Sequence, residues 1–193
     1  METEKIRVLI VEDDPDFCFL IQNTLLTAGM EVAGIAGTAP LACRLAAERN
    51  PDIVLMDLCL TGSGLEGVEA AKTIRLQTDA KVLILTSYED HRTIQEACCR
   101  SFAAGYIFKS QFELLVETVR KTAAGPTPQE HLIASLILSG LSPAEYSILE
   151  LLMGRDIKLQ SSPKTISNQK NHLLKKLGLG SQNELLHVFK GLI

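Results

Sequence analysis

The chain has 193 residues, of which 46% are hydrophobic and 22% charged, and its net charge is −4. No apolar run approaches the ~20 residues that a membrane span needs, and Glu2, Glu4 and Lys5 stand where a signal peptide would need an uninterrupted apolar stretch. We therefore expect a cytoplasmic protein that does not enter a membrane and that has one large domain with a short appendage.

The five cysteines are odd in number and lack the paired spacing of a zinc site, so we expect them to be reduced and mostly buried. Charge is unevenly spread along the chain. Residues 1–130 hold 12 basic and 19 acidic residues, whereas residues 131–193 hold 7 and 4. A negative first part and a positive tail suggest two units with different partners, and the tail's net charge of +3 permits nucleic-acid binding without proving it.

Short apolar runs alternate with helical patterns over the first 123 residues. The predicted strands are residues 6–11, 32–35, 53–56, 82–85 and 105–108, and the predicted helices are 15–28, 39–48, 66–76, 90–102 and 111–123. Asp14 and Asp90 precede two of the helices as expected caps. Five strand-then-helix units imply parallel strands with right-handed crossovers, which is a flavodoxin-like doubly wound α/β sheet in the order 2-1-3-4-5.

Polar residues suited to phosphate and metal chemistry follow four of the predicted strands. Glu12 and Asp13 follow the first strand, Asp57 the third, Thr86 the fourth and Lys109 the fifth. Ligands of open parallel sheets bind just outside the carboxyl ends of the strands, so these side chains should converge on one edge. Three carboxylates, a hydroxyl and an ammonium would form a cradle for Mg²⁺ and a phosphoryl group.

About residues 4–123 closely resemble the receiver domain of two-component response regulators. The matching segments, in order and at the family's spacing, are VLIVEDDP at residues 8–15, DIVLMDL at 52–58, LILTS at 83–87 and GYIFK at 105–109. The resemblance implies that Asp57 accepts a phosphoryl group from a sensor histidine kinase. It also implies that Mg²⁺ is held by Asp13, Asp57 and the main-chain carbonyl of Cys59, with Glu12 acting through water.

The resemblance further assigns a switch to the same edge of the sheet. Lys109 would pair with one phosphoryl oxygen and Thr86 would bond another. Movement of Thr86 would let Tyr106 rotate inward and remodel the face made by the fourth helix, the last strand and the fifth helix. The chain departs from the family after Asp57, where Thr61 replaces a proline and residues 62–64 (GSG) lengthen the loop. We expect this longer loop to affect metal affinity and acyl-phosphate lifetime.

Residues 124–139 are predicted to be a linker, and residues 140–193 a small all-α domain of three helices. Capping signals begin these helices at residues 142–145 (SPAE), 162–163 (SP) and 181–184 (SQNE). On the middle helix Ile166, Leu173 and Leu177 form an apolar stripe. The opposite face carries donors suited to a DNA groove, namely Lys164, Ser167, Asn168, Asn171 and Lys175, although a merely solvated face would look similar.

The tail resembles the NarL/LuxR-type helix-turn-helix, through residues 141–149 (LSPAEYSIL) and through 164–168 (KTISN) with 176–178 (KLG). In that family the residues matching Ser167, Asn168 and Asn171 face the major groove, and the last helix often mediates dimer contacts. Between Gly154 and Thr165, however, the chain is about five residues shorter than the family pattern, and the loss falls on the scaffold helix before the recognition helix.

These features together indicate a phosphorylatable receiver joined to a shortened DNA-binding module, acting as a transcription factor and as a homodimer when phosphorylated. Two alternatives remain. The tail could pair subunits or bind proteins without touching promoter DNA. The chain could also be a Mg²⁺-dependent phosphohydrolase of the haloacid dehalogenase type, although that family has an Asp-x-Asp motif after its first strand, where this chain has Glu12, Asp13 and Asp14. On the receiver interpretation the chain is not an enzyme beyond its own phosphoryl transfer and dephosphorylation.

Overall fold

The computed structural model describes residues 5–60, 66–157 and 162–193, and it divides into two compact units, Met1–Ile133 and Ala134–Ile193. The division falls inside the stretch predicted to be a linker. The lengthened loop at Thr61 and residues 62–64 lies outside the described residues. The expected domain limits, 1–123 and 140–193, remain a prediction.

The first unit is built on a five-stranded parallel sheet, as the sequence predicted. Its strands are β1 (Arg7–Val11), β2 (Glu31–Ala36), β3 (Ile53–Met56), β4 (Lys81–Thr86) and β5 (Gly105–Phe108), and their order is β2-β1-β3-β4-β5. Val11 pairs with Met56 in the register of β1 and β3. The next residue of each strand, Glu12 and Asp57, therefore leaves the sheet at the same edge.

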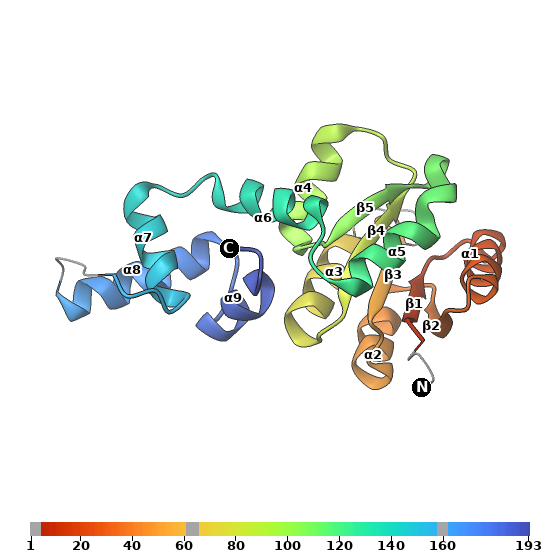
Figure 1. Ribbon diagram of the computed structural model, residues 1–193, viewed down its shortest axis with the longest axis horizontal. Coiled ribbons are helices and arrows are strands. Elements are labelled where there is room, and N and C mark those ends of the chain that lie inside the picture. The colour runs from red at the N-terminus through yellow and green to blue at the C-terminus, as the bar shows by residue number, and fades with distance from the viewer. Residues whose placement is uncertain (1–4, 61–65, 158–161) are drawn as a thin grey trace. The chain divides into compact units, whose positions relative to one another are not determined.

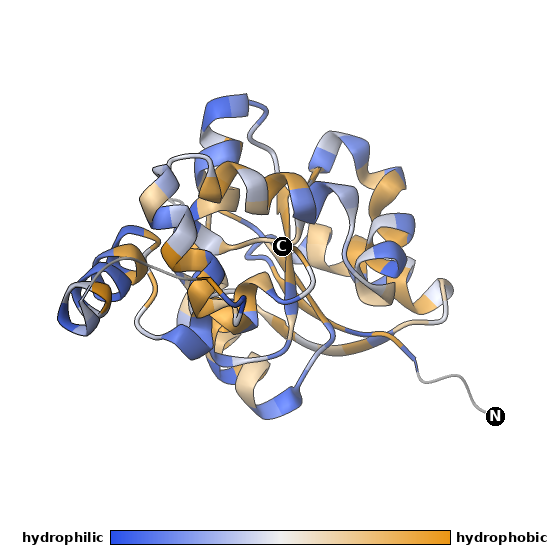
Figure 2. Ribbon diagram, turned by 60° about the vertical axis from the view of Figure 1, so that its left-hand side comes forward, coloured by the Kyte–Doolittle hydropathy of each residue, from blue (hydrophilic) through white to orange (hydrophobic). Residues whose placement is uncertain are grey.

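Helices cover both faces of this sheet (Figure 1). They are α1 (Pro15–Thr27), α2 (Ala39–Arg49), α3 (Glu66–Gln77), α4 (His91–Ser101) and α5 (Leu115–Ala124). Alternate strand residues enter two separate cores. Val8 and Ile10 pack with α1 and α5, whereas Leu9 and Val11 pack with α2 and α3. In Figure 2 the strands are mainly apolar, whereas the helices carry both polar and apolar residues.

Local signals explain where most helices begin. Asp14 Oδ1 accepts hydrogen bonds from the backbone N–H groups of Asp16 and Phe17, and Asp90 accepts from that of Thr93, which confirms both predicted caps. The predicted helix 111–123 was partly wrong, because Lys109–Leu114 forms a 3₁₀ helix, η1, and the α-helix starts only at Leu115. Gln111 has non-helical backbone angles, and Leu115 and Val119 then turn toward the core.

Residues expected to be linker contain a further helix, α6 (Pro128–Leu138). The Thr127 hydroxyl accepts from the N–H of Glu130, and proline occupies the first helical position. The sequence signal, Thr-Pro-Gln-Glu, has the same form as the Ser-Pro-Ala-Glu signal at residues 142–145. It could therefore have revealed this helix.

The second unit contains the three predicted helices, α7 (Pro143–Leu152), α8 (Pro163–Lys176) and α9 (Gln182–Phe189). Ser142 and Glu145 form the expected reciprocal capping box at the start of α7. The core is built from fully buried apolar residues contributed by all three helices, namely Leu149, Leu173, Leu185 and Phe189. Residues 153–157 and Ser162, the described parts of the connection from α7 to α8, contain no helix.

One glycine of the first unit permits a close backbone approach. A Cβ atom on Gly67 would lie 2.0 Å from the Asp57 carbonyl oxygen, whereas a Cβ on Gly37 would make only ordinary contacts of 3.7 Å and longer. We predict that Gly67→Ala lowers the free energy of unfolding by about 1–3 kcal/mol, because backbone must move. Gly37→Ala should change it by less than about 0.5 kcal/mol. Denaturant unfolding of both variants checks this, and equal stabilities would contradict it.

Candidate phosphorylation site

Three carboxylates meet at the carboxyl ends of β1 and β3. Glu12, Asp13 and Asp57 each offer an oxygen, and these ligand atoms all lie within 4.8 Å of one another. Glu12 and Asp57 are buried, with 3% and 7% of their surface exposed, whereas Asp13 is exposed. Such a set of oxygen donors fits a hard divalent cation such as Mg²⁺.

Lys109, at the end of β5, supplies positive charge to two of these carboxylates. Its Nζ lies 2.6 Å from Glu12 Oε2 and 2.9 Å from Asp57 Oδ2, and 4.6 Å from the centre of the Phe17 ring. Burial alone would lower the pKa of Lys109, but the hydrogen bonds to Glu12 and Asp57 outweigh that effect and raise it. Lys109 therefore stays charged in the site.

The carboxyl group of Glu12 has a raised pKa in this site. Burial raises its pKa, and the neighbouring charge of Asp57 adds to that effect, while the hydrogen bond with Lys109 opposes it. One ammonium thus does not fully offset two buried carboxylates. A bound divalent cation would offset the remaining charge.

The other predicted receiver residues lie at or near this edge. Thr86 is fully buried at the end of β4, and its Oγ1 accepts from the Tyr88 N–H at 3.1 Å. The Cys59 N–H donates to Asp57 Oδ1 at 3.3 Å, and its Sγ lies 3.2 Å from Tyr88 Oη. This sulfur contact, which the sequence did not indicate, joins the loop after β3 to the loop after β4.

Tyr106 is half-buried on β5, and its ring meets that of Phe108 edge to face at 5.3 Å. Its N–H donates to Oε1 of Gln129, in the first turn of α6. No local sequence pattern marks Gln129 as a partner of Tyr106, so the sequence did not predict this contact. Phe17 was also missed as a neighbour of Lys109, because a helical aromatic residue alone does not reveal which cation it will contact.

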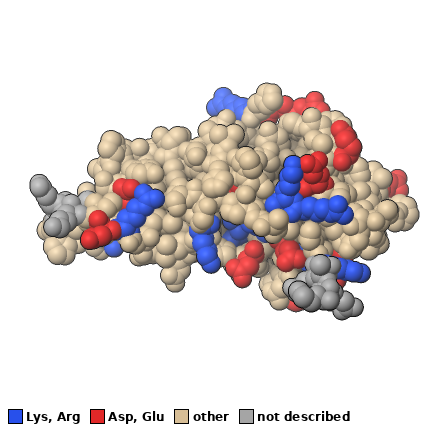
Figure 3. Space-filling model, in the orientation of Figure 1, with Lys and Arg blue, Asp and Glu red and all other residues tan. Residues whose placement is uncertain are grey.

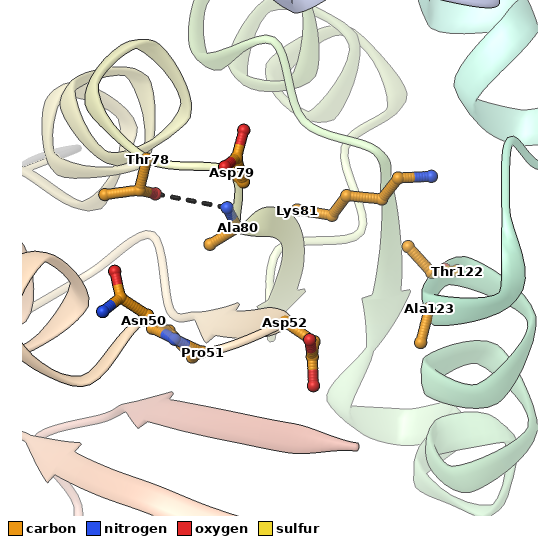
Figure 4. A pocket seen from close by; sticks show the side chains of 9 residues that line it. All are labelled: Asn50, Pro51, Asp52, Thr78, Asp79, Ala80, Lys81, Thr122 and Ala123. Atoms are coloured by element: carbon orange, nitrogen blue, oxygen red, sulfur yellow. Dashed lines mark hydrogen bonds between the residues drawn. The ribbon is translucent and has the colours of Figure 1, made fainter. Parts of the chain in front are cut away.

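A polar cavity of about 360 Å³ lies at the other end of the strands, where Asp52 precedes β3 and Lys81 begins β4 (Figure 4). None of the residues assigned to the phosphorylation site lines it. The cavity is therefore separate from the site.

In the second unit the five predicted DNA-contacting residues are all exposed on α8, namely Lys164, Ser167, Asn168, Asn171 and Lys175. Leu173 and Leu177 are buried as predicted, whereas Ile166 is only half-buried and Leu174 joins them in the core. On the face drawn in Figure 3, basic and acidic side chains of the described residues lie beside one another and form no single basic field.

Helices α7 and α8 pack directly on each other. Lys176 Nζ donates to Glu145 Oε2 at 2.7 Å and to the Gly140 carbonyl at 2.9 Å, which ties the end of α8 to the start of α7. A mainly apolar groove of about 240 Å³, lined by Ile148 and Asn168 among others, runs between the two helices. Asn168 thus has an apolar neighbourhood on one side.

Residues 8–120 match the response regulator receiver domain family. The chain belongs to the response regulators. It is 31% identical to the response regulator GacA of Pseudomonas aeruginosa over 204 aligned positions, which cover 93% of each chain. A LuxR-family two-component response regulator from Aurantimonas sp. SI85-9A1 has 31% identity and a TM-score of 0.55, covering 70% of this chain and 97% of its own.

The RcsB response regulator of Salmonella typhimurium matches the fold over 95% of this chain and 96% of its own, with 22% identity and a TM-score of 0.55. These relatives confirm the receiver fold and a likeness to LuxR-family transcriptional regulators over most of the chain. The cluster of Glu12, Asp13 and Asp57 is typical of the Mg²⁺ site of receivers.

Family membership decides against the phosphohydrolase alternative, because a receiver is the target of phosphoryl transfer and not a conventional enzyme. A response regulator implies a cognate histidine kinase. In the described part of the chain, no helix has both the length and the apolar character needed to cross a bilayer.

We predict that the stability of the second unit depends on pH through the Glu145 carboxylate. Its hydrogen bonds with Lys176 and with Ser142 lower its pKa from 4.5 to about 2. An acid whose pKa is lowered on folding stabilises the protein above its unfolded pKa, and this contribution disappears as pH falls through the folded pKa. The stability difference between the wild type and Glu145→Gln should therefore shrink between pH 4.5 and about pH 2.

Thermal unfolding followed across this pH range checks the prediction. In a Lys176→Met background, Glu145→Gln should have a smaller effect, because the largest cause of the lowered pKa is gone. A stability difference that is constant across the range would contradict the assignment.

Proposed function

We propose that this response regulator is phosphorylated on Asp57 by a histidine kinase and controls transcription through its C-terminal helices. The observation that carries the first part is the buried Asp57 carboxylate, which shares Lys109 with Glu12 at 2.9 and 2.6 Å. In the transfer, an Asp57 oxygen attacks phosphorus, the bond from phosphorus to the kinase histidine nitrogen breaks, and that nitrogen keeps the electron pair. An acyl phosphate results.

Each neighbouring group has a role in this proposal. Asp13, Asp57 and the main-chain carbonyl of Cys59 would hold Mg²⁺, with Glu12 acting through water. The ion would supply positive charge to the phosphoryl oxygens as they pass between donor and acceptor. Lys109 would shift from the Asp57 carboxylate to a phosphoryl oxygen. Thr86 would turn its hydroxyl toward another oxygen, and Tyr106 would rotate inward behind it.

The C-terminal proposal rests on α8. Its exposed face carries Lys164, Ser167, Asn168, Asn171 and Lys175, while its other face holds the core. Such a face can place amide and hydroxyl groups against base edges and ammonium groups against phosphates. Homodimerisation on phosphorylation would align two such helices. Leu186 of α9 is an exposed apolar residue, which supports a contact between copies there.

The alternative is an interaction regulator whose tail does not bind DNA. The short connection between α7 and α8 favours it, since residues 153–157 supply no scaffold helix.

Phosphorylation can be tested with acetyl phosphate and Mg²⁺. Intact-mass spectrometry should detect a single phosphoryl label that Asp57→Asn abolishes, because the amide cannot act as the acceptor. Asp79→Asn, which changes an exposed carboxylate at the far end of the sheet, should be labelled like the wild type. A label that persists in Asp57→Asn would refute the assignment of the acceptor.

DNA binding can be tested with the whole phosphorylated chain and duplex DNA at several salt concentrations. Lys164→Ala and Lys175→Ala should each reduce the slope of log K against log salt by about 0.9, because each removes about one phosphate contact. Lys121→Ala on α5 is the matched control and should leave the slope unchanged. The absence of binding at low salt would favour the interaction regulator.

A further inference from the structure

The first turn of α6 is held on the first unit by a buried charge cluster. The Glu130 carboxylate is 4% exposed and accepts from Lys81 Nζ at 2.9 Å, and Arg75 Nη2 lies 3.8 Å from its other oxygen. Arg75 itself is buried and donates to the carbonyls of Phe102 and Ala80. Glu130 is the third residue of α6, a position from which a glutamate often accepts a hydrogen bond from the start of its own helix. Here it pairs instead with Arg75 of α3 and Lys81 of β4.

Beside this anchor, Gln129 touches the strand that carries the switch residue. β5 lies at one edge of the sheet, so no strand among the described residues pairs with the outer side of its backbone. Gln129 Oε1 accepts the Tyr106 N–H there at 3.1 Å. A Cβ on Gly105 would lie 2.2 Å from the same oxygen, so any larger residue at that position would move the Gln129 side chain from its present place.

The two ends of β5 therefore have different partners. Lys109, directly after the strand, contacts Asp57, and Tyr106, near its start, contacts Gln129. The strand has only four residues, Gly105–Phe108. If Lys109 moves when Asp57 becomes an acyl phosphate, the movement needs to pass along only this short strand to reach the Tyr106 N–H. The helix that contacts this N–H, α6, continues to Leu138, beyond the division between the units.

We infer that residues 127–130 are a clamp, docked in cis on Arg75, Lys81 and the β5 edge, which opposes the phosphorylated state and passes the change at Asp57 to α6. This inference rests on the proposed phosphorylation of Asp57. Coupling between two sites is reciprocal in free energy, so if phosphorylation weakens the clamp, loss of the clamp must favour the phosphorylated form.

The test uses the full chain with Mg²⁺ and beryllium trifluoride, a phosphoryl analogue that binds aspartate reversibly. Gln129→Ala removes the oxygen that accepts the Tyr106 N–H. Gly105→Ala leaves Gln129 unsubstituted but puts a methyl group where its side-chain oxygen now lies. Each should tighten the apparent affinity for beryllium trifluoride by about fivefold, near the lower end of common allosteric couplings. Gln77→Ala, at an exposed position at the end of α3, is the matched control and should bind like the wild type.

Two measurements separate this coupling from a general change in stability. The double variant Gly105→Ala/Gln129→Ala should bind beryllium trifluoride no more tightly than either single variant, because both substitutions remove the same hydrogen bond, that from the Tyr106 N–H to Gln129. Hydrogen exchange at the Tyr106 amide should accelerate in Gln129→Ala, and in the wild type when beryllium trifluoride binds. If Gly105→Ala fails to fold, Gln129→Ala still decides the result.

If Gln129→Ala binds beryllium trifluoride with unchanged or weaker affinity, the inference that residues 127–130 oppose the phosphorylated state is wrong. Failure of the proposed function would look different, because the wild type would then bind beryllium trifluoride no better than Asp57→Asn does.

Discussion

The ion pair that joins Lys109 to Glu12 and Asp57 is the interaction on which this receiver depends. Residues from three strand ends meet at one ammonium, and the sheet register brings them there. Burial makes the charged form of Glu12 costly, as its raised pKa shows. A divalent cation bound among these carboxylates would offset the negative charge that Lys109 leaves uncompensated.

The strand that leads directly into Lys109, β5, begins beside the first turn of α6. Gln129 of α6 occupies part of the outer side of β5, while Glu130 beside it pairs with Lys81 of β4. Arg75 and Glu130 of this cluster are buried, so loss of either one would leave the other as an unpaired buried charge, which is costly. We therefore expect the contacts of Gln129 and Glu130 to form and break together.

The second unit compensates for its short connection by direct helix packing. Lys176 bridges the end of α8 to Glu145 and to the Gly140 carbonyl, and leucines from α7 and α8 share one core with Phe189. The face of α8 opposite that core remains exposed, whether or not a scaffold helix precedes it. Its polar residues are therefore available to DNA or to a partner protein.

The sequence by itself determined the sheet, its order and the residues at the strand ends, because alternating apolar runs and local caps such as Asp14 and Asp90 act over short distances. It also contained the start of α6, in the signal from Thr127 to Glu130. Only the tertiary structure decided where Glu130 and Gln129 point. Their partners, Arg75, Lys81 and Tyr106, are distant in sequence, and no local pattern specifies which buried charge will meet which.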